Sequence, residues 1–146
     1  MTYSTVPLTA GALDQRVADL MHEHPVTIPA SMPLAAAARQ MARRRVHAIL
    51  VRDEVGGPLG WVTARGLLHN VPRDWAGAAA GDAISEALVT IRDTASAREA
   101  LEAFAASGAS HLLVVGDPGG VVRGVVAESD MLWVLAPDGP SAPATT

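Results

Sequence analysis

The chain repeats one pattern of residues, so we expect two similar units in tandem. The tripeptide Val26–Ile28 recurs at Val89–Ile91, 63 residues further along the chain. The tripeptide Gly60–Val62 has its counterpart at Gly124–Val126, 64 residues further along. A period of this length predicts two copies of one supersecondary unit.

The spacing between matching residues changes by one along the repeat. His47 matches His111 at the larger spacing, which puts the additional residue near Ser107–Gly108, at the expected end of a helix. An insertion costs little there because the backbone is exposed. We therefore expect His47 and His111 to occupy equivalent positions at the start of a central strand.

Each copy predicts the element order β-α-β-β-α. A short β-branched strand is expected first, at 26–28 and at 89–91. A helix follows, because apolar residues recur there at i, i+4 and i+7. Gly- and Pro-rich turns then favour a hairpin. The buried strands are expected at 48–51 and 112–115, the return strands at 59–63 and 121–127, and the closing helices at 65–70 and 129–135.

The two longer helices carry sequence signals for their buried face and their ends. Ser31 and Thr94 precede these helices, and each can accept a hydrogen bond from a free backbone N–H. Gly108 is expected to end the second helix. The expected buried stripes are Leu34, Ala38 and Met41 in the first copy, and Ala97, Leu101 and Phe104 in the second.

Composition excludes several classes of protein. Hydrophobic residues make up 49% of the 146, enough for a packed core, and a net charge of −4 argues against nucleic-acid binding. The absence of cysteine excludes disulfides, cysteine-bound zinc and a thiol nucleophile. Neither a signal peptide nor an apolar run of membrane-spanning length is visible, so we expect a cytoplasmic protein with no membrane partner.

The same features predict the domain boundaries. We expect an N-terminal extension at 1–13, a first domain at 14–71, a linker at 72–82, a second domain at 83–136 and a disordered tail at 137–146. The linker and the tail are assigned from their Pro, Gly and Ala content.

Two motifs in register carry a resemblance to a known family. The return strands continue as GWVTARG at 60–66 and GVVAESD at 124–130, and Val17–Met21 precedes the first strand. With a repeat of about 64 residues, this pattern resembles the CBS domain over roughly residues 14–136. The resemblance implies an α+β fold, in which two β-α-β-β-α units pack by pseudo-twofold symmetry.

The resemblance also implies a regulatory function without catalysis. CBS-domain pairs bind AMP, ADP, ATP, S-adenosylmethionine or cyclic dinucleotides in the cleft between the units, and a partner protein reads the change. No cofactor is obligatory. A homodimer is the implied assembly, and Leu132 and Trp133 lie on the helix that contributes to dimerisation in this family.

The family pattern identifies candidate ligand-binding residues in both copies. Backbone of the first strand contacts adenine, a hydroxyl at the start of the closing helix contacts phosphate, and a carboxylate binds ribose. Carried onto this chain, the candidates are Thr27, Ile28, His47, Thr63, Arg65, Thr90, Ile91, His111, Ser129 and Asp130.

Each copy departs from the family pattern at one polar position. The first keeps Thr63 but has Gly66 where the carboxylate is expected. The second keeps Asp130 but has Ala127 where the hydroxyl is expected. If ribose recognition needs the carboxylate, only the second site binds a nucleoside in the usual manner. The first site keeps Arg65, which could hold a phosphate.

Structural roles compete with these functional roles. Asp130 could instead stabilise the dipole of a helix N-terminus, and Thr63 could cap the helix that follows. Arg43–Arg45 suits the C-terminus of a helix, or a phosphate in the cleft. His22–His24 has a spacing that could bind a metal, but no further ligand supports such a site.

Other functions remain as alternatives. The degraded motifs are also compatible with a ligand-free scaffold that dimerises or docks a partner. Nucleic-acid binding would require a basic patch, which Arg39 and Arg43–Arg45 could supply locally. An enzyme is not expected, because no nucleophile elbow, carboxylate pair or Gly-rich phosphate loop is present.

Overall fold

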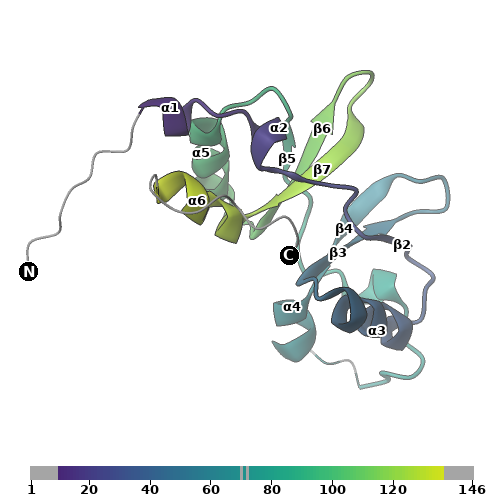
Figure 1. Ribbon diagram of the computed structural model, residues 1–146. Coiled ribbons are helices and arrows are strands. Elements are labelled where there is room, and N and C mark those ends of the chain that lie inside the picture. Colours follow the sequence, from purple (N-terminus) through teal and green to yellow (C-terminus); the bar gives the residue numbers. More distant parts are fainter. Residues whose placement is uncertain (1–9, 70, 72, 137–146) are drawn as a thin grey trace, which may run out of the picture. The chain divides into compact units, whose positions relative to one another are not determined.

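The computed structural model describes residues 10–69, 71 and 73–136 (Figure 1). The chain divides into two compact units, one formed by residues 24–89 and the other by residues 10–23 together with 90–136. The predicted tail at 137–146 and most of the N-terminal extension lie outside the described residues. Within the described part of the chain, no helix has the length and apolar character needed to cross a bilayer.

The first unit is a three-stranded sheet with helices. The order in the sheet is β2-β3-β4, with β2 parallel and β4 antiparallel to β3. Ile28, Ile49 and Val62 supply buried side chains from the three strands, and Leu34 and Met41 supply them from α3. The elements are β2 (Thr27–Pro29), α3 (Leu34–Arg44), β3 (Ala48–Arg52), β4 (Pro58–Thr63), α4 (Ala64–His69) and the 3₁₀ helix η1 (Ala80–Ala83).

The second unit repeats this plan and adds an edge strand. Its sheet has the order β1-β7-β6-β5, in which the N-terminal strand β1 pairs antiparallel with β7. The repeated elements are β5 (Thr90–Arg92), α5 (Ala97–Ser107), β6 (His111–Gly116), β7 (Val121–Ala127), the 3₁₀ helix η2 (Glu128–Met131) and α6 (Leu132–Leu135). The N-terminal elements are α1 (Ala10–Leu13), α2 (Val17–Leu20) and β1 (His22–Glu23). The predicted α+β class and the order β-α-β-β-α are confirmed.

Each unit takes in a segment that precedes the other repeat in the sequence. Val17 is fully buried in the second unit, and its N–H donates to the Ala95 carbonyl at 2.8 Å. Ala80 is fully buried in the first unit, and its N–H donates to the Met32 carbonyl at 2.8 Å. Part of the segment expected to be a linker therefore belongs to a core, and the compact units do not coincide with the sequence repeats.

The helix caps differ from those expected. Pro33 is the N-cap of α3 and offers no side-chain hydrogen bond, so Ser31 does not cap this helix. Ser96, and not Thr94, caps α5 by accepting from the Glu99 N–H at 3.2 Å. Both helices begin later than expected, so the two predicted capping residues lie too far upstream. Gly108 ends α5 with a left-handed φ of 69°, as predicted.

Leu34, Met41 and Ala97 are buried as expected, but the middle position of each buried stripe is shifted by one residue. Ala37 and Ala100 are fully buried, whereas Ala38 and Leu101 are half-buried. Small side chains face the sheet because they let the helix approach it closely. Phe104, the last residue of the expected second stripe, is half-buried.

The strand register moves the additional residue of the second repeat into its hairpin. Ala48 pairs with Thr63 in the first sheet, and His111 pairs with Ala127 in the second. The residue equivalent to His111 is therefore Ala48, and the expected equivalence of His47 and His111 is wrong. The offset between equivalent residues is 63 in the central strands β3 and β6 and 64 where the return strands β4 and β7 end. The additional residue lies in the hairpin between them, because a turn can lengthen without changing the pairing of the strands.

Candidate functional site

The candidate residues of the first repeat lie at one end of its sheet. Strands β2 and β3 begin at this end and β4 finishes there, because β2 and β3 are parallel and β4 is antiparallel. Thr27 opens β2, Thr63 ends β4, and the His47 carbonyl accepts from the Ala64 N–H at 2.8 Å. Arg65 follows on α4 with an exposed side chain.

The edge strands leave part of their backbone facing outward. The Val26 carbonyl accepts from the Leu50 N–H, and the Ala30 N–H donates to the Arg52 carbonyl, so these residues bond toward β3. Because backbone groups alternate along a parallel strand, Thr27 points its N–H and C=O to the open side of the sheet. Ile28 is buried, with 1% of its surface exposed, so its side chain belongs to the core.

The candidates of the second repeat gather in the same way. Thr90 opens the edge strand β5 in the position of Thr27, and Ile91 is half-buried beside it. His111 opens β6, and its Nδ1 lies 2.8 Å from the Ser110 hydroxyl. Ser129 and Asp130 lie on η2, directly after β7 ends. Each repeat thus brings its own candidates to one end of one sheet.

The Thr63 hydroxyl is already engaged within the first unit. It accepts from the Gly66 N–H at 3.0 Å, which is the capping role, and lies 2.9 Å from the Ser85 hydroxyl. Thr63 is only 7% exposed. A Cβ added at Gly66 would overlap the Ser85 side chain, so the first repeat has no room for the expected carboxylate.

The Asp130 carboxylate has two partners within the second unit. Oδ2 accepts from the Ala127 N–H at 2.8 Å, and Oδ1 accepts from His22 Nε2 at 3.0 Å. The Asp130 side chain is 12% exposed and that of His22 is 34% exposed. The backbone contact stabilises the start of η2, while the contact with His22 ties this turn to the N-terminal segment.

His22 and Ser85 contact the candidate residues Asp130 and Thr63, and the sequence patterns did not identify either of them. His22 pairs with Val125 of β7, and Ser85 donates its backbone N–H to the carbonyl of Trp61 in β4. These two residues are 63 positions apart, the spacing of the first strands, so extending the repeat upstream would have matched them. The segment that precedes each repeat's first strand therefore contributes a further polar side chain, His22 near Asp130 and Ser85 near Thr63.

These arrangements differ in the chemistry that they offer. The second site presents a carboxylate next to the exposed Ser129, suited to hydroxyl donors such as those of a ribose, and Thr90 is exposed at the same end of the sheet. The first site presents hydroxyls already bonded to each other and the exposed cation Arg65. Among the described residues, no group of three His, Asp or Glu side chains is arranged to hold a metal ion.

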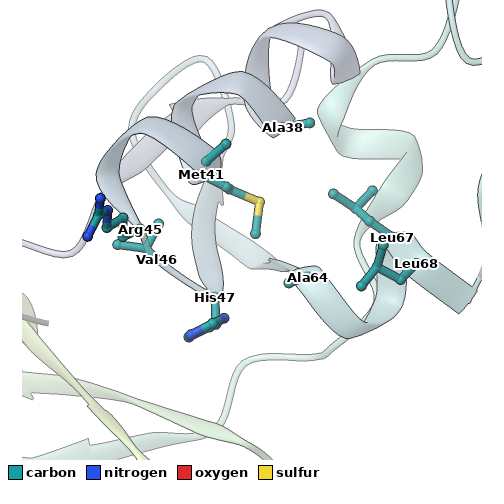
Figure 2. A pocket seen from close by; sticks show the side chains of 9 residues that line it. Ala38, Met41, Arg45, Val46, His47, Ala64, Leu67 and Leu68 are labelled. Carbon is teal, nitrogen blue, oxygen red and sulfur yellow. The ribbon is translucent and has the colours of Figure 1, made fainter.

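A groove of about 360 Å³ opens between α3 and α4 of the first unit (Figure 2). Figure 2 shows Met41 of α3 pointing toward Leu67 and Leu68 of α4 across this groove. Arg45 and His47 bring polar atoms to one end of a lining that is otherwise apolar. None of the predicted site residues other than His47 lines it.

Solved structures share this fold at low sequence identity. An uncharacterised protein from Pyrococcus horikoshii has a TM-score of 0.72 and 19% identity, over 90% of this chain and 98% of that one. A bacterial CNNM/CorC family Mg²⁺ transporter CBS domain in complex with ATP has a TM-score of 0.74 and 19% identity, covering 86% and 89%. A CBS domain protein from Pyrobaculum aerophilum complexed with AMP has a TM-score of 0.69 and 24% identity, covering 80% and 90%.

Family membership follows from the sequence itself. A comparison with curated proteins gives no match. The family model for the CBS domain matches twice, over residues 17–73 and 80–137, which together span most of the chain. The chain therefore belongs to the CBS domain family and contains two CBS domains in tandem.

Proposed function

We propose that this CBS pair is a regulatory module that binds an adenine nucleotide or a related adenosyl ligand at its second repeat. The candidates are AMP, ADP, ATP and S-adenosylmethionine. Binding changes the conformation of the module, and a partner protein reads the change. We further propose that the module is non-enzymatic, cytoplasmic and homodimeric.

The observation that carries this proposal is the position of Asp130. Its carboxylate lies at the β7–η2 corner, at the same end of the sheet as Thr90, which opens β5 on the other side of β6. A carboxylate oxygen has two acceptor positions, so Asp130 can bind ribose hydroxyls in addition to the Ala127 N–H. His22 has to move aside or share Oδ1 when a ribose binds there.

The first repeat is proposed as a weaker site or none. Gly66 stands at its β4–α4 corner where the carboxylate is expected, and Ser85 fills the space that a side chain would need there. Arg65 and Arg73 are exposed cations that could attract a phosphate without recognising ribose. Two structures with this fold were solved in complex with ATP and with AMP, which favours adenine nucleotides as the first ligands to test.

Thermal unfolding with and without AMP, ATP and S-adenosylmethionine tests the proposal. At about one hundred times the Kd, a ligand of the native state adds about 2.7 kcal/mol of stability and raises Tm by a few degrees. We expect one of these ligands to shift Tm. Asp130→Asn should reduce the affinity about ten- to a hundredfold, because a charged acceptor for the ribose is lost.

Asp117→Asn is the matched control. Asp117 is an exposed carboxylate of the same repeat at the hairpin, where it pairs with Arg92 at 2.9 Å. This variant should bind the ligand as the unmodified chain does. Equal affinity in Asp130→Asn would reject the proposed ribose contact.

The second candidate function is a scaffold that binds no nucleotide. It is favoured by the hydrogen bonds that already occupy the polar groups, Thr63 with Ser85 and Asp130 with His22. Absence of a Tm shift with all three ligands, together with a stable dimer, would favour this scaffold.

A further inference from the structure

The two repeats place their cationic side chains at different ends of their own sheets. In each repeat the candidate residues lie at the end of the sheet where the central strand begins, β3 in the first and β6 in the second. We call this end the site end, and the hairpin lies at the opposite end. The chain contains no lysine, so the positions of its arginines decide which end attracts an anion.

The site end of the first repeat is basic. Helix α3 finishes there with Arg43 and Arg44 in its last turn and Arg45 as its cap. Arg65 follows Thr63 by two residues, on α4, and all four arginines are exposed. These cations offset the negative end of the α3 dipole and favour the approach of an anion.

The corresponding positions of the second repeat carry small residues without charge. Strand register and helix ends give the residues equivalent to Arg43, Arg44, Arg45 and Arg65 as Ala106, Ser107, Gly108 and Ser129. The last turn of α5 therefore leaves the carbonyl end of this helix without a basic residue. Carboxylates are present instead. Glu128 stands in the position of Ala64. Asp130 stands in the position of Gly66.

The arginines of the second unit belong to the hairpin end of its sheet. Arg92 ends β5 and pairs with Asp117 in the hairpin at 2.9 Å. Arg16 bridges to Ser96, directly before α5 begins. Among the described residues of this unit, no guanidinium group therefore belongs to the site end. The other two arginines lie in the first half of β7 and in the first turn of α5: Arg123 and Arg98.

The backbone at the β7–η2 corner is engaged as well. The Ala127 N–H donates to Asp130 Oδ2 at 2.8 Å, and the Glu128 N–H donates to the Ser110 carbonyl at 2.9 Å. Neither N–H is left to donate to a phosphate, although backbone N–H groups at the start of a helix often do so. The nearby imidazole of His22 faces the Asp130 carboxylate at 3.0 Å.

We propose that the second repeat selects an adenosyl ligand that carries no phosphate. The 5′ substituent of this ligand is neutral or positively charged, as in adenosine or in the sulfonium of S-adenosylmethionine. The carboxylates of Glu128 and Asp130 and the negative end of the α5 dipole attract a cation and repel a phosphate. This inference rests on the proposed ribose contact of Asp130 and adds the charge class of ligand that the site accepts.

Calorimetric titration with adenosine, AMP, ATP and S-adenosylmethionine tests this selection at about pH 8, where histidine is ordinarily neutral. We expect ATP to bind at least about tenfold more weakly than adenosine, with AMP between them, because like charges meet at the site. S-adenosylmethionine should bind at least as tightly as adenosine. Added salt should narrow these differences, since it screens exposed charges. Each titration is repeated with Asp130→Asn, and only binding that this variant weakens is assigned to the second repeat.

Charge reversal at Glu128 provides a matched test. Glu128 is exposed, and Glu128→Arg should raise the affinity for ATP relative to adenosine by about tenfold, because a cation then lies at the site end. Glu99→Arg is the control. Glu99 is an exposed carboxylate in the first turn of α5, at the hairpin end, so the net charge changes equally in both variants. An equal gain in the two variants would overturn the inference, because net charge and not the site end would then set the preference.

The outcomes separate this inference from the proposed function. If none of the four compounds shows binding that depends on Asp130, both the adenosyl site and its selectivity are overturned. If AMP or ATP binds more tightly than adenosine, and Asp130→Asn weakens that binding, the adenosyl site stands and the selection against phosphate is overturned.

Discussion

Asp130 and Gly66 occupy corresponding positions, each just after the return strand of its repeat. Their surroundings differ because His22 contacts Asp130 whereas Ser85 lies against Gly66. Ser85 fills the space beside Gly66 and bonds Thr63, whereas His22 in the same relative position bonds Asp130. The first repeat, which lacks the carboxylate, thus has the small Ser85 hydroxyl at this position. The second repeat, which has Asp130, has the His22 imidazole there. In each repeat, the polar group at this position forms a hydrogen bond with the residue from the N-terminally adjoining segment: Thr63 with Ser85, and Asp130 with His22.

Replacing His22 tests whether this residue competes with the ligand. His22→Ala should raise the affinity for the adenine nucleotide about two- to tenfold, because ribose no longer displaces a hydrogen bond from Oδ1. Isothermal titration calorimetry with AMP measures the change. Glu23→Ala, at the exposed neighbour, should leave the affinity unchanged. A lower affinity in His22→Ala would mean that the imidazole contacts the ligand.

At the scale of elements, the short N-terminal helices belong to the unit that is distant in sequence. Helix α1 contacts α5 and α6, and α2 contacts α5, while β1 adds an edge strand to β7 (Figure 1). Such short helices are not stable alone, so packing against the second repeat stabilises them. In the first unit, η1 has the same position in the repeat as α2.

The core position of Val17 gives a prediction about these elements. Val17→Ala should lower the free energy of unfolding by about 2 kcal/mol, because it removes two buried methyl groups and leaves a cavity. Hydrogen exchange should accelerate at residues 112–114 of β6 and change less at residues 49–51 of β3. The control Val71→Ala, at a residue that is 62% exposed, should change neither. Equal acceleration in both strands would contradict the assignment of α2 to the second unit.

At the scale of the whole molecule, the two repeats keep one fold but differ in charge. The helices of the first are basic and those of the second are acidic, so the net charge of −4 conceals two surfaces of opposite sign. Such a distribution favours association between unlike surfaces.

If association stabilises the fold, thermal unfolding will depend on protein concentration. A tenfold increase contributes about 1.4 kcal/mol per dimer, which for two chains of this length raises the apparent Tm by about 2 °C. Differential scanning calorimetry over a hundredfold range of concentration measures this slope. A flat profile for the unmodified chain would argue against a dimer coupled to folding.

The element order was predictable from local patterns, and the site residues remain candidates. Alternating and β-branched residues predicted the strands, the Gly108 signal predicted a helix end, and the family motif identified Asp130. These features depend on residues that are close together in the sequence. Helix starts and the buried stripe were less well predicted, since Ala37 and Ala100 face the sheet for reasons of packing.

The contacts between distant segments followed only from the folded chain. Val17 meets Ala95, and His22 meets Asp130 across 108 positions of sequence, and no local periodicity encodes either pairing. The hairpin position of the additional residue likewise became visible only through strand register. Sequence fixes elements through neighbouring residues, because propensity and periodicity act over a few positions. Tertiary packing selects which elements share a core and which side chains meet at a site, because burial and hydrogen bonding act between residues wherever they lie in the chain.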